Sequence, residues 1–134
     1  MVITQDCDLL SDYRIRSEPA FDNSKPNLLQ HIFFCEIYEE PEIRVRIAPD
    51  IWRRVRQNQD ERYHCFPEAA VENSPDRLPL LFLDFKRILS FSTEGLYLGI
   101  QEGSIRRIGF LPLSYLVDFS HRFFSFHSRV FLPD

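Results

Sequence analysis

Two aspartates flank a cysteine near the start of the chain, in the triplet Asp6-Cys7-Asp8. Residues 2–4 favour a strand, and we expect the triplet to continue it, with Asp6 and Asp8 on one face. Paired carboxylates on one face can hold Mg²⁺ or act in acid–base chemistry. Alternatively, the aspartates cap a turn and Cys7 is a small core residue. We favour this second interpretation, because the sequence offers no third metal ligand beside them.

A second candidate site is the adjacent pair His64 and Cys65. The pair could join Cys7 or Cys35 at a metal, or Cys65 could be a nucleophile served by a distant histidine. Neighbouring strand residues face opposite ways, so only one of the two can enter a given site. We favour a core cysteine beside a surface histidine. The three cysteines are far apart and form no C-x-x-C pair, so we expect reduced thiols, no bound metal and no cofactor.

The last candidates lie near the C-terminus. His121 and Arg122 are expected on the outer face of a helix, and His121 with Arg129 could form a nuclease-like pair for acid–base chemistry and phosphate binding. We favour a solvated helix face and an ion pair in the tail instead. The candidate catalytic residues are therefore Asp6, Asp8, His64 and Arg129.

The charge of the chain is unevenly distributed. Residues 1–42 carry a net charge of −6, whereas residues 43–62 contain six arginines and carry +3. Together with Trp52 and Tyr63, this basic segment is similar to RNA-binding surfaces. However, Trp52 shares helical spacing with Val55, which favours a place in the core. The whole chain has a net charge of −4, so we do not expect a nucleic acid partner.

Length and composition limit the class of protein. The 134 residues are 44% hydrophobic and 27% charged, which predicts one globular domain over residues 1–134. No apolar run approaches the roughly 18–20 residues of a membrane span. Asp6 and Asp8 interrupt any apolar segment of a signal peptide. We therefore expect a cytoplasmic protein with no membrane association.

Two segments have the apolar spacing of helices. In residues 49–60, Pro49 and Asp50 suit the first turn of a helix. In residues 112–127, the apolar side chains recur at positions that predict about four turns. We expect this second helix to bury Leu113, Leu116, Val117, Phe123 and Phe124 against the sheet.

Other segments favour strands and loops. Residues 30–38 form a continuous apolar run, which is typical of a strand buried on both faces. Residues 43–47 alternate between apolar side chains and arginines, which predicts a short half-buried strand. Residues 63–67 are a short extended piece. Two segments, 17–27 and 68–77, have the composition of loops.

Residues 78–111 carry the strongest strand pattern. Short segments at 93–95 and 102–104 contain glycine and resemble turns, so this span predicts a three-stranded antiparallel meander. The elements together predict an α+β fold: a small, mainly antiparallel, curved sheet or partly open barrel with two helices.

Three segments resemble an uncharacterised bacterial family whose members have a "TQ-x-CDL" strand and an "R-V-x-L-P" tail. The segments are residues 2–9, 58–67 and 123–133. The family has no settled activity. The resemblance implies an accessory component of bacterial gene clusters, linked to phage defence or toxin–antitoxin systems. More sequence commonly precedes the first motif in that family; it is absent here, which fits the abrupt start of the expected strand at residue 2.

Three functions stay open from the sequence. The leading hypothesis is a non-enzymatic bacterial accessory or protein-interaction domain. The first alternative is a nuclease-like or toxin-like enzyme that processes nucleic acid, and the second is a metal-bound regulatory module. Residues 2–4 form a strand with no lead-in, which predicts a homodimer or a complex with a partner protein. The competing interpretation is that these residues add to the sheet within one chain.

Overall fold

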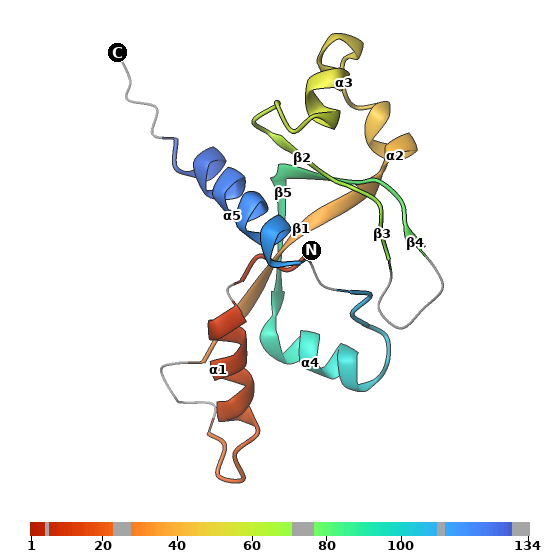
Figure 1. Ribbon diagram of the computed structural model, residues 1–134. Helices are drawn as coiled ribbons and strands as arrows, with labels where there is room; N and C mark the ends of the chain where they lie inside the picture. The colour runs from red at the N-terminus through yellow and green to blue at the C-terminus, as the bar shows by residue number, and fades with distance from the viewer. Residues whose placement is uncertain (5, 23–27, 71–76, 110–111, 130–134) are drawn as a thin grey trace. The chain divides into compact units, whose positions relative to one another are not determined.

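The computed structural model describes residues 1–4, 6–22, 28–70, 77–109 and 112–129. It confirms the predicted α+β class (Figure 1). In chain order the elements are α1 (Asp6–Arg16), β1 (His31–Glu39), α2 (Glu40–Arg44), α3 (Pro49–Arg56), β2 (Tyr63–Phe66), β3 (Ala69–Ala70), β4 (Arg77–Leu78), β5 (Leu81–Ser92), α4 (Thr93–Gln101) and α5 (Leu113–His127). Among the described residues, no helix is long and apolar enough to cross a membrane.

The main sheet is open and antiparallel, with the strand order β1-β5-β2. The long strand β5 is therefore the middle strand. β2 pairs with the first part of β5, from Tyr63 opposite Asp84 to Phe66 opposite Leu81. A separate two-stranded sheet joins β3 and β4. The fold is thus an open sheet with several helices.

The chain divides into two compact units. The first comprises Met1–Cys35 and Ile88–Arg106, and the second comprises Glu36–Arg87 and Arg107–Asp134. Strands β1 and β5 each have residues in both units. The prediction of one domain over residues 1–134 stays a prediction.

In the first unit, the start of the chain extends the sheet along β1. Val2 forms an antiparallel bridge with Phe34, and the Ile3 amide donates a 2.9 Å hydrogen bond to the Phe33 carbonyl. Residues 2–4 therefore add to the sheet within one chain. A homodimer or a partner protein stays a prediction.

The prediction that β1 is buried on both faces is wrong. Ile32, Cys35 and Tyr38 are buried, whereas Phe33 is 48% exposed and Ile37 is 38% exposed. The side that carries Ile32 and Tyr38 is buried or half-buried, whereas the opposite side is exposed except at Cys35. The apolar run in the sequence is longer than the buried set, because several exposed positions also carry apolar side chains.

The expected continuation of the first strand through Asp6 and Asp8 is also wrong, because α1 begins at Asp6. Acidic residues at the start of this helix and Arg14 and Arg16 in its last turn suit the helix dipole. Successive helical residues are separated by about 100°, so positions 6 and 8 lie about 200° apart around the axis. The two aspartates do not share a face of this element.

The predicted meander is correct for β5 and wrong after Ser92. Residues 93–101 form helix α4, whose N-cap is Ser92: its hydroxyl accepts a 3.1 Å hydrogen bond from the Gly95 amide. Leu96 and Gly99 are buried, three residues apart on one helix face. Residues 105–109 form no strand, and Phe110 lies outside the described residues.

In the second unit, the half-buried strand predicted over residues 43–47 is wrong, because a short helix, α2, begins at Glu40. Glu39 and Glu42 form a capping box, and the helix has proline in its first turn. Ile43 and Ile47 are both buried, while Val45 is 84% exposed. Ile43 lies in α2 and Ile47 in the turn that follows it, and the spacing of these two buried residues also fits an alternating strand.

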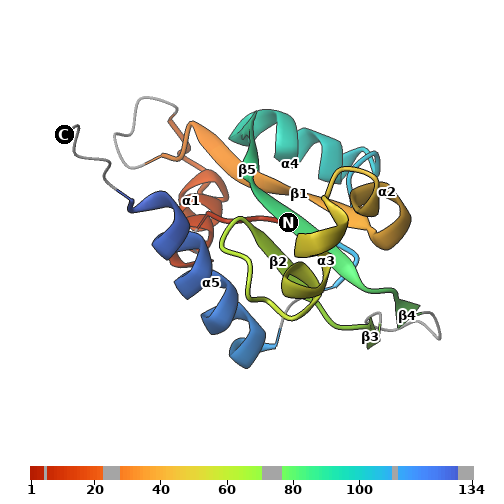
Figure 2. The same ribbon diagram turned by 90° about the horizontal axis from the view of Figure 1, so that it is seen from above.

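The core of the second unit lies against β2. Helix α3, which the sequence predicted over residues 49–60, ends at Arg56, and both α3 and α5 contact β2 (Figure 2). Trp52 packs against this core, as predicted, with its ring 5.2 Å from that of Phe82. The buried core residues are Tyr38, Ile43, Ile47, Val55, Tyr63, Cys65 and Phe82.

The helix predicted over residues 112–127 is confirmed as α5, but its predicted buried face is wrong. Phe119 is buried, whereas Leu113 and Phe124 are each 75% exposed and Val117 is 60% exposed. Phe123 is half-buried. The helix packs through the face that contains Phe119 and Phe123. Apolar residues occur on more than one face of this helix, so spacing alone did not select the buried one.

Candidate functional site

The four predicted catalytic residues occupy two different elements and the segment after α5. Asp6 and Asp8 are in the first turns of α1, where Asp8 is exposed and the side chain of Asp6 lies outside the described set. His64 lies in β2. Arg129 follows α5, and its Nη2 lies 2.6 Å from Oε2 of Glu61, which confirms the predicted tail ion pair.

The prediction of a surface histidine is wrong, because His64 is only 1% exposed. Its ring contacts Phe66, Phe85 and Phe119, with centroid distances of 4.5, 6.3 and 5.6 Å. The Nδ1 atom accepts a 3.1 Å hydrogen bond from Nε of Arg122. An arginine always donates here, so this bond fixes Nδ1 as the unprotonated nitrogen of the imidazole.

Arg122 was expected on the outer face of its helix, and this prediction is wrong as well. Its guanidinium donates to the carbonyl oxygens of Asp60 and Tyr63, at 2.6 and 2.8 Å, and also to that of Asn58. With the bond to His64, one side chain satisfies four acceptors. Arg122 therefore ties α5 to the segment that leads into β2.

The environment of His64 keeps it neutral at physiological pH. Burial, reinforced by the nearby Arg122 charge, lowers the pKa of His64 from 6.5 to about 4. A solvent-facing general base needs an accessible nitrogen and a pKa near the working pH. The described surroundings of His64 suit a structural role better than catalysis.

This environment predicts a pH dependence of stability. The unfolded chain binds a proton at His64 below about pH 6.5, whereas the folded chain resists protonation until about pH 4. We expect the folded state to lose roughly 3 kcal/mol as the pH falls through this range, with no loss above it. Urea unfolding at a series of pH values measures the effect.

A His64→Asn variant is the control for this prediction. Asparagine can present an acceptor oxygen near the position of Nδ1, but it does not titrate. The difference in unfolding free energy between the two proteins should shrink as the pH falls from 6.5 to 4. Parallel pH profiles for the two proteins would contradict the assignment to His64.

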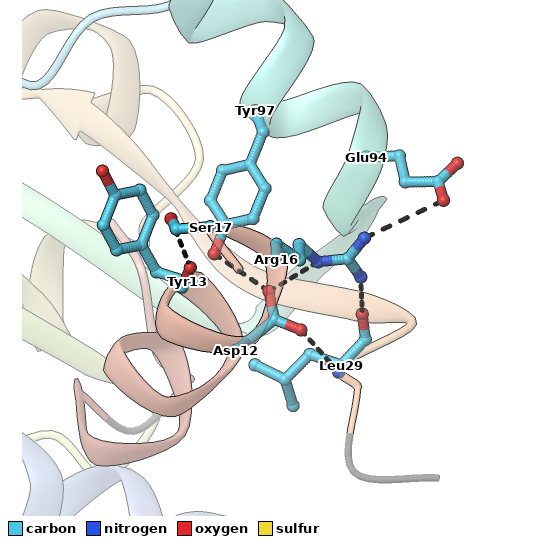
Figure 3. Close-up of polar contacts among 7 residues, drawn as sticks. All are labelled: Asp12, Tyr13, Arg16, Ser17, Leu29, Glu94 and Tyr97. Carbon is cyan, nitrogen blue, oxygen red and sulfur yellow. Dashed lines mark hydrogen bonds and ion pairs between the residues drawn. The ribbon is translucent and has the colours of Figure 1, made fainter. Parts of the chain in front are cut away.

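The first unit contains a separate polar network around Asp12, which the sequence did not single out (Figure 3). Asp12 is fully buried on α1. Its Oδ2 accepts a 2.8 Å bond from Nε of Arg16 and a 3.0 Å bond from the hydroxyl of Tyr97, while its Oδ1 accepts a 2.9 Å bond from the Leu29 amide. This one carboxylate joins α1, the segment before β1, and α4.

Arg16 extends the network towards solvent. Its Nη2 donates a 3.0 Å hydrogen bond to the Leu29 carbonyl, and its Nη1 lies 3.8 Å from Oε1 of Glu94 (Figure 3). The Glu94 side chain is 70% exposed. A surface pocket of about 230 Å³ lies beside these groups, lined by Arg16, Leu28, Gln30, His31, Ser92 and Glu94.

The bonding of Asp12 limits its chemistry. Both of its oxygens already accept hydrogen bonds, and it has no exposed surface from which to accept a substrate proton. Burial, together with the bond to Asp12, raises the pKa of Tyr97 to about 12, so the phenol stays protonated as a donor. We interpret the network as structural support for the first unit.

The most unusual surface lies on β5. Its first half is buried at Phe82, Leu83, Asp84 and Phe85, but every residue of 86–92 is exposed. A middle strand normally has neighbours on both edges and is among the best covered parts of a sheet. The exposed apolar residues in this half of the strand are Ile88 at 37%, Leu89 at 43% and Phe91 at 48%.

The backbone pairing explains this exposure. The ladder between β2 and β5 ends at Tyr63 and Asp84, followed by one bond from the Phe85 amide to the Arg62 carbonyl at 3.0 Å. Among the described residues, the pairing of β2 with β5 reaches no further than this bond. The sequence predicted this strand but gave no indication of where its pairing with β2 ends, because a strand does not encode its neighbours.

Comparisons with known proteins add no assignment: no protein-family model, no curated protein and no solved structure matches the chain.

Within the described part of the chain, no group of three or more His, Cys, Asp or Glu side chains could hold a metal ion. Cys35 and Cys65 are buried thiols, and the side chain of Cys7 lies outside the described set. The exposed apolar segment of β5 within the first unit, residues 88–92, is the candidate functional site.

Proposed function

We propose that this chain is a protein-interaction domain whose binding surface is the β5 edge, defined as residues 88–92, which all lie in the first unit. The observation that carries the proposal is the exposure of apolar side chains on the middle strand of the sheet. An accessory role in bacterial gene clusters, which the sequence resemblance implies, agrees with this function. A cytoplasmic location belongs to the same proposal.

Physical chemistry supports this choice. An unpaired strand edge presents backbone N–H and C=O groups to any extended chain, and proteins usually protect such edges with charge, proline or a covering element. Exposed apolar side chains beside an open edge add hydrophobic burial to the hydrogen bonds that a new strand would form. Ile88, Leu89 and Phe91 are exposed in this segment, and the Phe91 ring also packs edge-on against Phe34, with the ring centroids 5.3 Å apart.

A peptide-display selection against the purified chain tests the proposal. We expect selected peptides to bind the unaltered chain, and to bind a Leu89→Glu variant roughly tenfold more weakly or worse, because a charge replaces an apolar contact at the centre of the edge. The matched control is Val45→Glu, which places the same charge on an apolar residue that is 84% exposed outside the edge. Val45→Glu should leave the affinities unchanged.

The result that would contradict the proposal is equally specific. A selection that enriches no peptide would contradict it. Selected peptides that bind the unaltered chain and the Leu89→Glu variant with the same affinity would contradict it as well. Circular dichroism of both variants checks that the fold is retained, which is expected because the two substituted side chains are solvent-exposed.

A further inference from the structure

We infer that the outer face of α5 pairs with the same face of a second copy of this chain, with the two helices antiparallel. The outer face is defined as the side of α5 that carries Leu113, Val117, Ser120 and Phe124. Helix α5 lies wholly within the second unit. The inference goes beyond the proposed function, which concerns a strand of the first unit.

The outer face lies opposite the side through which α5 packs beside β2 (Figure 2). Successive helical residues are separated by about 100°, so the four residues of the outer face fall within about 60° of one another. Phe119 and Phe126 lie on the other side, where both rings contact Phe85, at centroid distances of 5.9 and 5.7 Å. Arg122 lies beside them and donates to the Tyr63 carbonyl at 2.8 Å. The packing of α5 within its own unit therefore leaves the outer face uncovered.

The outer face is strongly exposed for an apolar surface. Leu113 and Phe124 are each 75% exposed, and among the large apolar residues that the structure describes only Val45 is more exposed. A phenylalanine ring has no polar group to offer to water. Exposed apolar patches of this kind mark surfaces that bind other molecules.

The spacing of the outer face suits a partner identical to itself. From Leu113 to Val117, Ser120 and Phe124 the intervals are four, three and four residues, so the spacing is the same in both chain directions. A two-fold interface needs a surface that is complementary to itself. In an antiparallel pair, Phe124 of each copy lies against Leu113 of the other, and Val117 lies against Ser120. Alternating intervals of three and four residues also form the seam of coiled-coil helices.

Charge also favours a second copy in the antiparallel direction. No residue of the outer face is charged, so two copies approach without repulsion between like charges. Antiparallel helices have opposed dipoles, and the two C-terminal ends, each with His127, lie at opposite ends of the interface. A lipid surface fits less well, because membrane-binding helices carry several lysines and arginines beside the apolar face. Helix α5 has no lysine, and its one arginine, Arg122, is on the packed side.

The size of the outer face sets the expected affinity. Helix α5 has 15 residues, which makes it about 22 Å long. An interface that is one helix long and one helix wide is smaller than the roughly 800 Å² per partner of a standard stable complex. We therefore expect a weak dimer that forms at micromolar concentrations and dissociates on dilution.

Sedimentation equilibrium of the full chain, from low micromolar to submillimolar concentration, tests the association. We expect Phe124→Glu and Val117→Glu each to raise the dissociation constant at least about tenfold, because each places a charge in the apolar seam. The matched controls are Val45→Glu, at a residue that is 84% exposed outside α5, and Leu89→Glu in the first unit. Both controls should dimerise like the unaltered chain. Circular dichroism checks that all four variants are folded.

Cysteine cross-linking tests the direction of pairing. Under mild oxidation, a mixture of Leu113→Cys and Phe124→Cys chains should form a disulfide-linked heterodimer. Phe124→Cys alone should not link to itself, because its two copies would lie about 16 Å apart along the helix axis, farther than the roughly 7 Å between Cα atoms that a disulfide spans. The unaltered chain is the control for the native thiols, of which Cys35 and Cys65 are buried.

Four results would overturn the inference. The first is a chain that stays monomeric over the whole concentration range. The second is self-association that Phe124→Glu leaves unchanged or that Leu89→Glu abolishes, since it would belong to another surface. The third is Phe124→Cys linking to itself as readily as to Leu113→Cys. The fourth is a monomer that binds phosphatidylcholine–phosphatidylglycerol vesicles through Phe124, which would assign the face to lipid. Each leaves the peptide-display test of the proposed function unaffected.

Discussion

Replacing Arg122 by methionine is expected to lower the free energy of unfolding by about 3–5 kcal/mol. Methionine has a similar length and keeps apolar packing, but it donates no hydrogen bonds. The carbonyl oxygens of Asp60 and Tyr63 would lose donors at 2.6 and 2.8 Å, and Nδ1 of His64 would lose its donor at 3.1 Å. Part-buried acceptors without partners are more costly than the lost bonds alone. Urea unfolding at neutral pH measures the change.

Arg129, which follows the end of α5, provides a matched control for Arg122. It also forms a short contact, 2.6 Å to Glu61, but both of those side chains are substantially exposed, at 39% and 69%. Surface ion pairs contribute about 0–1 kcal/mol, so Arg129→Met should be nearly neutral. Similar losses for the two variants would show that the carbonyl-binding role of Arg122 has been overstated. Should Arg122→Met fail to fold, Arg122→Lys, which keeps the charge and some donors, should recover part of the stability.

Sequence patterns predicted those elements whose apolar spacing fits one structure only. The helix over residues 112–127 and the strand over residues 30–38 are both present, because each run is long and strongly apolar. The alternate apolar residues Leu96, Leu98 and Ile100 predict a strand. However, Leu96 and Ile100 are also four residues apart, which is the spacing of one face of a helix. The hydroxyl of Ser92 caps the N-terminus of α4, which favours the helix over the strand.

The burial of His64 was missed for a different reason. The alternation of a strand places His64 and Cys65 on opposite faces, and the sequence predicts that the face with His64 is solvent-exposed. Both faces of β2 are covered: Tyr63 and Cys65 belong to the core that includes Val55, and the other face meets α5. A four-residue strand carries too little pattern to show that two different helices cover it.

The buried side of α1 could not be recognised from the apolar pattern, because Asp12, rather than an apolar residue, is buried among the α1 side chains that the structure describes. A search for apolar residues at helical spacing finds no stripe in residues 6–16. The prediction of a strand therefore extended into a segment whose helix depends on polar bonds to Leu29 and Tyr97. Long-range partners of this kind cannot be identified from spacing.

Changing Asp12 to asparagine should therefore be severely destabilising, by about 3–5 kcal/mol, although the two side chains have nearly the same shape. Three donors converge on the carboxylate: Nε of Arg16, the Leu29 amide and the hydroxyl of Tyr97. Asparagine offers one acceptor oxygen and an NH₂ group, so at least one of these donors must face another donor. The substitution also removes the buried anionic partner of the Arg16 side chain, which is only 13% exposed, and leaves it the exposed Glu94 at 3.8 Å.

Glu94→Gln is the control for this variant, because it removes a second carboxylate from the same network at an exposed position. Glu94 lies 3.8 Å from Arg16 and is 70% exposed, so its loss should change the unfolding free energy by less than about 1 kcal/mol. Thermal and urea unfolding of the two variants should separate them clearly. An Asp12→Asn variant as stable as Glu94→Gln would mean that α1 does not depend on the buried carboxylate, and that packing of its neighbouring side chains holds the helix in place.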